Sequence, residues 1–144
     1  MINSKIASIF YEISEIYELK GVQWKPQAYN KAARIIENMS EDLKKIYDKK
    51  GINGLDEISG VGKGISKKIE EYIKTGRINE YNKLKKSIPK GLLKLLEIQG
   101  IGPKKAALLY RKLKIKNLKD LEKAVRKHKI KNLERFGEKS EEDI

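Results

Sequence analysis

Apolar residues recur three and four positions apart along most of the 144-residue chain, which is the spacing of one face of an α-helix. The first such segment, 3–20, carries six of them: Ile6, Ile9, Phe10, Ile13, Ile16 and Tyr17. Asn3 or Ser4 can cap its start, and Gly21 can end it. We therefore expect a core-facing helix whose aromatic side chains serve packing.

The same spacing, interrupted by glycine, proline and asparagine, predicts helices in the rest of the chain. They cover 26–38, 41–50, 55–58, 65–75, 78–86, 103–113 and a last segment that Asn117 caps, while 91–98 is a short segment that leads into the glycine-containing stretch after it. We expect Ser40 to cap the helix 41–50, and Asn53 and Gly54 to form a turn. Alternating apolar and polar runs, which would indicate strands, do not occur. The predicted fold class is all-α, a helical bundle.

Two glycine-centred segments repeat one pattern, I-S-G-V-G-K-G-I at 58–65 and I-Q-G-I-G-P-K-K at 98–105. The aligned residues are Gly60 with Gly100, Val61 with Ile101, and Gly62 with Gly102. Each segment lies between a short apolar stretch and a strongly helical one, which is the layout of a helix–hairpin–helix unit. The sequence therefore predicts tandem helix–hairpin–helix motifs.

Glycine suits such a turn because it reaches positive φ and lets a phosphate approach the backbone closely. The exposed N–H groups and the start of the following helix attract an anion, and no base edge is read. A single G-V-G could be an ordinary turn between helices. Two aligned copies favour a nucleic-acid backbone site, whose candidate residues include those that follow the glycines: Lys63, Gly64, Lys104 and Lys105.

The charge balance supports a polyanionic partner. The chain has 33 Lys and Arg against 20 Asp and Glu, a net charge of +13. Much of the excess lies in 103–132, with twelve basic and two acidic residues. A field of this sign attracts nucleic acid and makes binding dependent on salt. An RNA- or ribosome-associated protein is an alternative, although only Tyr29 among the tyrosines lies near a proposed pocket, and no stacking surface for single-stranded RNA is evident.

Cysteine is absent, so disulfides and cysteine-based metal sites are excluded. No apolar run approaches the roughly 18 residues of a membrane span, and the N-terminus lacks a signal-peptide pattern. We expect a cytoplasmic, nucleoid-associated monomer with no membrane partner.

Four segments resemble the N-terminal part of family X DNA polymerases, the gap-filling repair enzymes related to DNA polymerase beta. They are Q-A-Y-N-K-A-A-R-I-I (27–36), I-S-G-V-G-K-G-I-S-K-K-I-E-E-Y-I-K-T-G (58–76), I-Q-G-I-G-P-K-K-A (98–106) and F-G-E-K-S (136–140). The glycine and lysine after the first hairpin point to the bacterial and archaeal branch. The resemblance implies a module of base excision repair that binds gapped or nicked DNA.

We expect two subdomains that meet near Ser87–Gly91. By resemblance, 1–86 is a lyase-like domain with the first hairpin. Residues 90–144 are a duplex-gripping subdomain with the second hairpin and the start of a third at Phe136-Gly137.

The resemblance makes Lys68 the lysine that forms a Schiff base with an opened 5′-deoxyribose phosphate and releases it by β-elimination. It makes Lys25 and Tyr29 the residues that hold the 5′-phosphate, and Lys31 on the same helix joins the candidate DNA-binding residues. By helical spacing, Lys68 lies at the edge of the buried side. Partial burial beside Lys25 should favour the neutral amine that the reaction requires.

The chain departs from the best-known lyase members at three positions. Gly64 and Glu80 stand where those members have lysines, and Trp24 where they have histidine. These changes predict a weaker 5′-phosphate pocket.

Polymerase chemistry needs paired carboxylates for two metal ions, and this sequence has no Asp-x-Asp. We therefore expect part of a longer polymerase, with a non-enzymatic binding module or scaffold as the alternative. The lyase reaction itself requires no cofactor.

The resemblance also implies a K⁺ or Na⁺ ion at each hairpin, held by backbone carbonyls. By position the carbonyls belong to Asp56, Ile58 and Val61, and to Leu96, Ile98 and Ile101.

Overall fold

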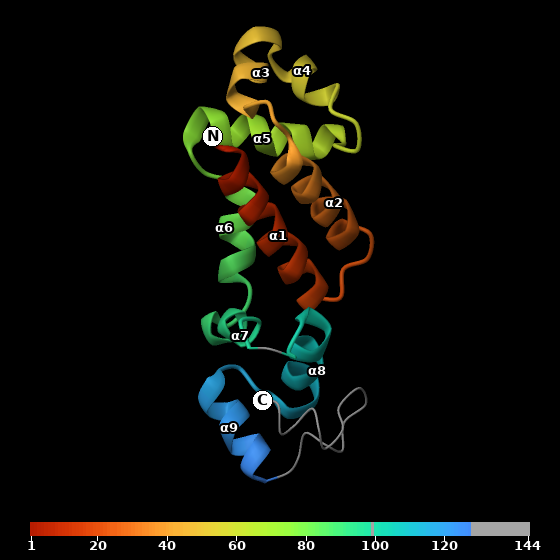
Figure 1. Ribbon diagram of the computed structural model, residues 1–144. Coiled ribbons are helices and arrows are strands. Elements are labelled where there is room, and N and C mark those ends of the chain that lie inside the picture. The colour runs from red at the N-terminus through yellow and green to blue at the C-terminus, as the bar shows by residue number, and fades with distance from the viewer. Residues whose placement is uncertain (99, 128–144) are drawn as a thin grey trace. The chain divides into compact units, whose positions relative to one another are not determined.

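The computed structural model describes residues 1–98 and 100–127. The expected start of a third hairpin at Phe136-Gly137 lies outside this range. Helices account for all the regular structure in these described residues, which confirms the predicted all-α class. In order they are α1 (Asn3–Leu19), α2 (Lys25–Asn38), α3 (Leu43–Lys50), α4 (Ile52–Asp56), α5 (Lys63–Thr75), α6 (Asn79–Lys86), α7 (Lys90–Leu95), α8 (Pro103–Leu113) and α9 (Leu118–Arg126) (Figure 1).

The chain forms two compact units. Unit 1 comprises Met1–Tyr17 and Val22–Lys83, and unit 2 comprises Glu18–Gly21 with the chain from Leu84 onward. Each unit contains one of the two glycine hairpins.

Unit 1 is built on the pair α1 and α2, which run side by side in Figure 1. Phe10 of α1 is fully buried and meets the Tyr29 ring of α2 edge-on, with 5.4 Å between centroids. The Ser14 hydroxyl donates to the Pro26 carbonyl at 2.8 Å, which fixes the start of α2 against the second half of α1. The predicted apolar face of α1 is therefore the core face, because burial of these side chains stabilises the pair.

Two predicted caps are wrong. Asn3 is buried, and its side chain bonds the Glu41 carbonyl and the Leu43 N–H, so it ties α1 to the start of α3. The cap of α3 is Asp42, whose carboxylate accepts from the Lys44 N–H at 2.9 Å. Ser40 is exposed and precedes the helix.

The predicted turn at Asn53-Gly54 is also wrong, because both residues lie inside α4. A Cβ on Gly54 would lie 2.8 Å from the Lys50 Cβ and 2.9 Å from the Ile46 Cγ2. Glycine therefore allows α4 to pack closely on α3. Position 54 is glycine because of this close packing, and not because of a turn.

Unit 2 has its own core, drawn from α7, α8, α9, their connections and the last residue of α1. Its buried members are Leu19, Leu92, Leu95, Ile101, Ala106, Ala107, Leu109, Ile115, Leu121 and Ala124. Asn117 caps α9 as predicted, accepting from the Asp120 N–H. Gly91 lies inside α7, and a Cβ there would lie 2.6 Å from both the Asn117 Cβ and the Lys116 carbonyl oxygen. Close packing of α7 on the start of α9 thus requires glycine.

Candidate functional site

The first hairpin connects α4 to α5. Gly60 has φ +86°, a backbone conformation that glycine adopts without strain. The Val61 N–H donates to the Ile58 carbonyl at 3.2 Å, and the Val61 side chain is buried. The bend is thus anchored on one side by its apolar residue while Gly60 and Gly62 are exposed.

The second hairpin repeats this geometry in unit 2. Gly100 has φ +89°, the Ile101 N–H donates to the Ile98 carbonyl at 3.0 Å, and Ile101 is buried. The repeat seen in the sequence is therefore a repeat of backbone structure. Pro103 occupies the first turn of α8, where a missing N–H removes no helical hydrogen bond.

The structure separates the roles of the two glycines in each hairpin. Only the first has positive φ; the second is the N-cap of the following helix, with φ −76° at Gly62 and −91° at Gly102. A Cβ at either cap would meet nothing within 4 Å. Neither cap has a side-chain hydrogen bond, so the first N–H groups of α5 and α8 lack the usual side-chain acceptor. The open space at Gly62 and Gly102 leaves the backbone N–H groups at the starts of α5 and α8 accessible, and such groups bind anions.

Basic side chains lie beside both bends. Lys63 and Gly64 form the first turn of α5, and Lys104 and Lys105 lie in the first turn of α8. Lys31 of α2 reaches the first bend, since its Cε lies 3.2 Å from where a Gly60 Cβ would be. In unit 2, Lys104 Nζ lies 4.0 Å from the Glu18 carboxylate.

A second polar cluster, here called the Glu80 cluster, lies within unit 1. Its members are Tyr17, Lys25, Tyr29, Lys68 and Glu80. The Tyr29 hydroxyl donates to Glu80 Oε2 at 2.6 Å, and the Tyr17 hydroxyl donates to Glu80 Oε1. Lys68 Nζ lies 3.5 Å from Oε2, and Lys25 Nζ lies 4.0 Å from Oε1. One carboxylate thus accepts hydrogen bonds from two phenols and forms ion pairs with two ammonium groups.

Burial raises the pKa of the Glu80 carboxyl, but the hydrogen bonds from both phenols and the charges of the two lysines outweigh it, so the pKa is lowered. Burial raises the pKa of Tyr17 and of Tyr29, and their hydrogen bonds to Glu80 raise it further. The phenols therefore stay protonated as donors, and the carboxylate stays ionised.

The sequence placed Lys68 at the boundary of the buried side, and its side chain is 33% exposed. Lys25 does lie in the same cluster, with its side chain 55% exposed and its ammonium 4.8 Å from the Tyr17 ring centroid. Glu80 stands where the best-known lyase members have a lysine. The sequence does not show that its carboxylate is the ion-pair partner of Lys68.

Tyr17 is a site residue that the sequence analysis missed. It was interpreted as packing, and its ring is indeed buried, but its hydroxyl also enters the cluster. Its partner Glu80 lies 63 positions away, so no local pattern reports the contact. Trp24, next to Lys25, is 81% exposed and has φ +72°, a strained value for a residue other than glycine.

The carbonyls expected to hold a monovalent cation suit one chemically, because carbonyl oxygens are hard ligands. Those of Ile58 and Ile98 each accept one N–H within the bend and keep a second lone pair. Asp56 Oδ1 is buried without a hydrogen-bond partner, and a cation would offset its charge. Its counterpart in the second hairpin, Leu96, carries no charge.

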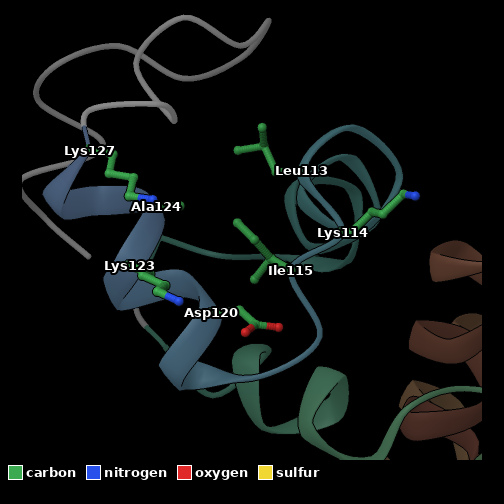
Figure 2. Close-up of a pocket in the computed structure, with 7 residues that line it drawn as sticks. All are labelled: Leu113, Lys114, Ile115, Asp120, Lys123, Ala124 and Lys127. Carbon is green, nitrogen blue, oxygen red and sulfur yellow. The ribbon is translucent and has the colours of Figure 1, made fainter.

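Unit 2 also has a pocket of about 220 Å³ between the end of α8 and α9. Its lining residues are Leu113, Lys114, Ile115, Asp120, Lys123, Ala124 and Lys127 (Figure 2). Lys114 extends away from Asp120 in Figure 2, and Asp120 already accepts from the Lys116 N–H. Because the pocket lies at the opposite end of α8 from the hairpin, it adds nothing to the anion surface there.

Within the residues that the structure describes, no helix is both long and apolar enough to cross a membrane. Residues 1–78 match the helix-hairpin-helix domain family, and residues 92–144 match the SAM-like helix-hairpin-helix tandem family.

The DNA polymerase/3′-5′ exonuclease PolX of Bacillus subtilis (strain 168) is 36% identical to this chain over 140 residues. That alignment covers 96% of this chain and 24% of the relative, so the chain spans about a quarter of that protein's length. The resemblance drawn from the sequence motifs is thereby confirmed.

Proposed function

The chain belongs to the helix-hairpin-helix domain family, and from this premise we propose that it binds gapped or nicked DNA through the sugar–phosphate backbone, without regard to base sequence. The observation that carries the proposal is the repeated pair of open glycine caps. Gly62 and Gly102 leave space above the first amides of α5 and α8, and lysines flank both sites.

Backbone amides and lysines contact phosphates, which are the same at every base pair. Affinity should therefore vary little with sequence and fall steeply with salt, because each neutralised phosphate releases counterions. The net charge of +13 acts in the same direction. An RNA-binding role has no comparable support, because the hydroxyls of four tyrosines among the described residues donate hydrogen bonds to carboxylates: Tyr17, Tyr29, Tyr47 and Tyr81.

The binding experiment uses fluorescence anisotropy with two duplexes of unrelated sequence, each measured intact and with a one-nucleotide gap. We expect the two sequences to agree within roughly three-fold, and the log of affinity to fall linearly with the log of salt concentration. A strong preference for one sequence, or affinity that does not respond to salt, would contradict backbone recognition.

We further propose that Lys68 supports lyase chemistry on a 5′-deoxyribose phosphate. Its amine would attack the C1′ aldehyde of the opened sugar and form an imine with loss of water. Loss of the C2′ proton to a base would then break the C3′–oxygen bond and release the DNA strand with its 5′-phosphate. Hydrolysis of the imine would return Lys68. Its support is the half-buried position of Lys68 in a cluster with two phenols and Lys25.

Borohydride reduction tests this step, because it converts the imine into a stable covalent adduct with a 5′-incised abasic duplex. Lys68→Ala should lose the adduct, and Lys67→Ala, an exposed neighbour on the same helix, should keep it. Equal trapping by Lys68→Ala and the parent would reject the assignment. Salt-sensitive DNA binding with no adduct in any protein would leave the chain as a non-enzymatic binding module.

We propose in addition that K⁺ or Na⁺ binds the hairpin carbonyls; close to the first hairpin in sequence, the buried Asp56 Oδ1 has no hydrogen-bond partner. Replacing K⁺ with tetramethylammonium at constant ionic strength should weaken DNA binding. Unchanged affinity would argue against the ion.

A further inference from the structure

The polar groups that face the Glu80 carboxylate are all hydrogen-bond donors. Tyr17 comes from α1, Tyr29 and Lys25 from α2, and Lys68 from α5, while Glu80 itself is the second residue of α6. The Glu80 side chain is 20% exposed. Three helices thus direct hydrogen-bond donors and positive charge at one anion.

This donor set is one that a phosphate monoester would use. Ammonium and hydroxyl groups bind phosphate oxygens, and a phosphate offers three acceptors and more negative charge than a carboxylate. Without Glu80 the four donors would carry a charge of +2 from Lys25 and Lys68. With Glu80 in place the charge falls to +1 and both phenol protons are already donated.

We infer that Glu80 occupies the phosphate site of unit 1 as an internal anion, and that a 5′-phosphate of gapped DNA binds there only by displacing it. This inference rests on the proposed function. Two anions cannot share the site, because like charges a few ångströms apart repel and compete for the same donors.

The local structure permits the displacement. Glu80 lies in the first turn of α6 and Ile78 just before it is buried, so the backbone is fixed while the side chain can rotate toward solvent. The rotation would release both phenols and also remove the ion-pair partner of Lys68. Phosphate binding would then replace the Glu80 carboxylate with the phosphate as the anionic partner of the phenols and Lys68.

The test compares two one-nucleotide-gap duplexes that differ only in a 5′-phosphate or a 5′-hydroxyl on the downstream strand. The quantity measured is the ratio of their dissociation constants, which cancels what the hairpins contribute to both. We expect Glu80→Gln to raise the preference for the 5′-phosphate by roughly ten-fold over the parent, since a unit charge at contact distance acts strongly near a protein surface.

Glu41→Gln is the matched control. It makes the same change of charge beyond the far end of α2, a helix of 14 residues and so about 20 Å long. Glu41→Gln should strengthen the binding of both duplexes equally and leave the ratio of their dissociation constants unchanged. Adding Lys25→Gln to Glu80→Gln should abolish the gain, and Lys25 is exposed enough to be replaced without loss of fold.

An unchanged or lower ratio in Glu80→Gln, with the helical circular dichroism and melting temperature retained, would overturn the inference and make Glu80 an organiser of the phenols. If Glu80→Gln unfolds, Lys25→Gln alone decides: a reduced 5′-phosphate preference supports the site, and an unchanged one rejects it. Failure of every protein to bind either duplex would instead contradict the proposed function.

Discussion

At the scale of single residues, the Glu80 carboxylate makes unit 1 sensitive to acid. Burial raises the pKa of the Glu80 carboxyl. The hydrogen bonds from the two phenols and the charges of the two lysines lower this pKa by more, so that it lies below the ordinary value of 4.5. An unfolded chain would protonate Glu80 near that ordinary value. Its contribution to stability is thus complete above about pH 4.5 and is lost as the pH falls through the lower, folded-state pKa.

Urea unfolding followed by circular dichroism at several pH values checks this prediction. The free energy of unfolding should fall as the pH is lowered below about 4.5, and Glu80→Gln should show a shallower fall. Glu41→Gln should keep the parent's slope. If the parent and Glu80→Gln lose stability equally, Glu80 is not held ionised by its partners.

The residues of this cluster show what a sequence can and cannot predict about a site. The motifs placed Lys25, Tyr29 and Lys68 among the candidates, and the structure brings all three together. Tyr17 and the role of Glu80 were missed, because the contacts of Glu80 with the two phenols span 63 and 51 positions. Only the packing of three helices against α6 creates them.

At the scale of the element, the start of α3 depends on one side chain. The Asp42 carboxylate accepts the Lys44 N–H, so Asp42→Ala should lower the free energy of unfolding by about 1 kcal/mol. Ser40→Ala, at the exposed residue that the pattern favoured, should change it by less than about 0.5 kcal/mol. Urea unfolding of the two variants side by side measures both, and the reverse order would show that the cap is assigned to the wrong residue.

The hairpins give a second prediction at this scale. Gly62 and Gly102 have ordinary φ and open space, so Gly62→Val and Gly102→Val should fold and keep their helical circular dichroism. Each should weaken DNA binding, by roughly ten-fold, since the new side chain covers the helix-start amides. Anisotropy with a gapped duplex measures the loss.

Gly60→Ala is the contrasting variant. Its φ is positive and its Cβ would lie 2.4 Å from the Ile35 Cδ1, so it should lower stability as well as binding. If Gly62→Val loses helix content as Gly60→Ala does, then Gly62 is needed for the fold and not for the ligand.

The predicted helices are found throughout the described residues, but their limits moved by a few positions. Periodicity locates the buried face of a helix, whereas the limits depend on which of several capping residues bonds the backbone. Ser40 and Asp42 are both capping residues, and only the structure selects Asp42. The short α4 was misplaced because Gly54 was interpreted as a turn residue when its role is close packing on α3.

At the scale of the whole molecule, each unit has its own buried core and its own hairpin. The two hairpins share the positive φ of the first glycine, the buried residue after it and the open second glycine. The same bend thus forms on two different cores, in agreement with the proposal that both hairpins bind the DNA backbone. The net charge of +13 then favours the approach of DNA to both.

The most direct test of this account is a titration of ¹⁵N-labelled protein with a short gapped duplex, followed amide by amide in ¹H–¹⁵N correlation spectra. If the hairpins bind the phosphates, the largest shifts will fall on the backbone amides of Gly62, Lys63 and Gly64 in the first hairpin, and of Gly102 and Lys104 in the second. The same amides should move with a duplex of unrelated sequence. Bound DNA that leaves those five amides unshifted while others move would contradict this account.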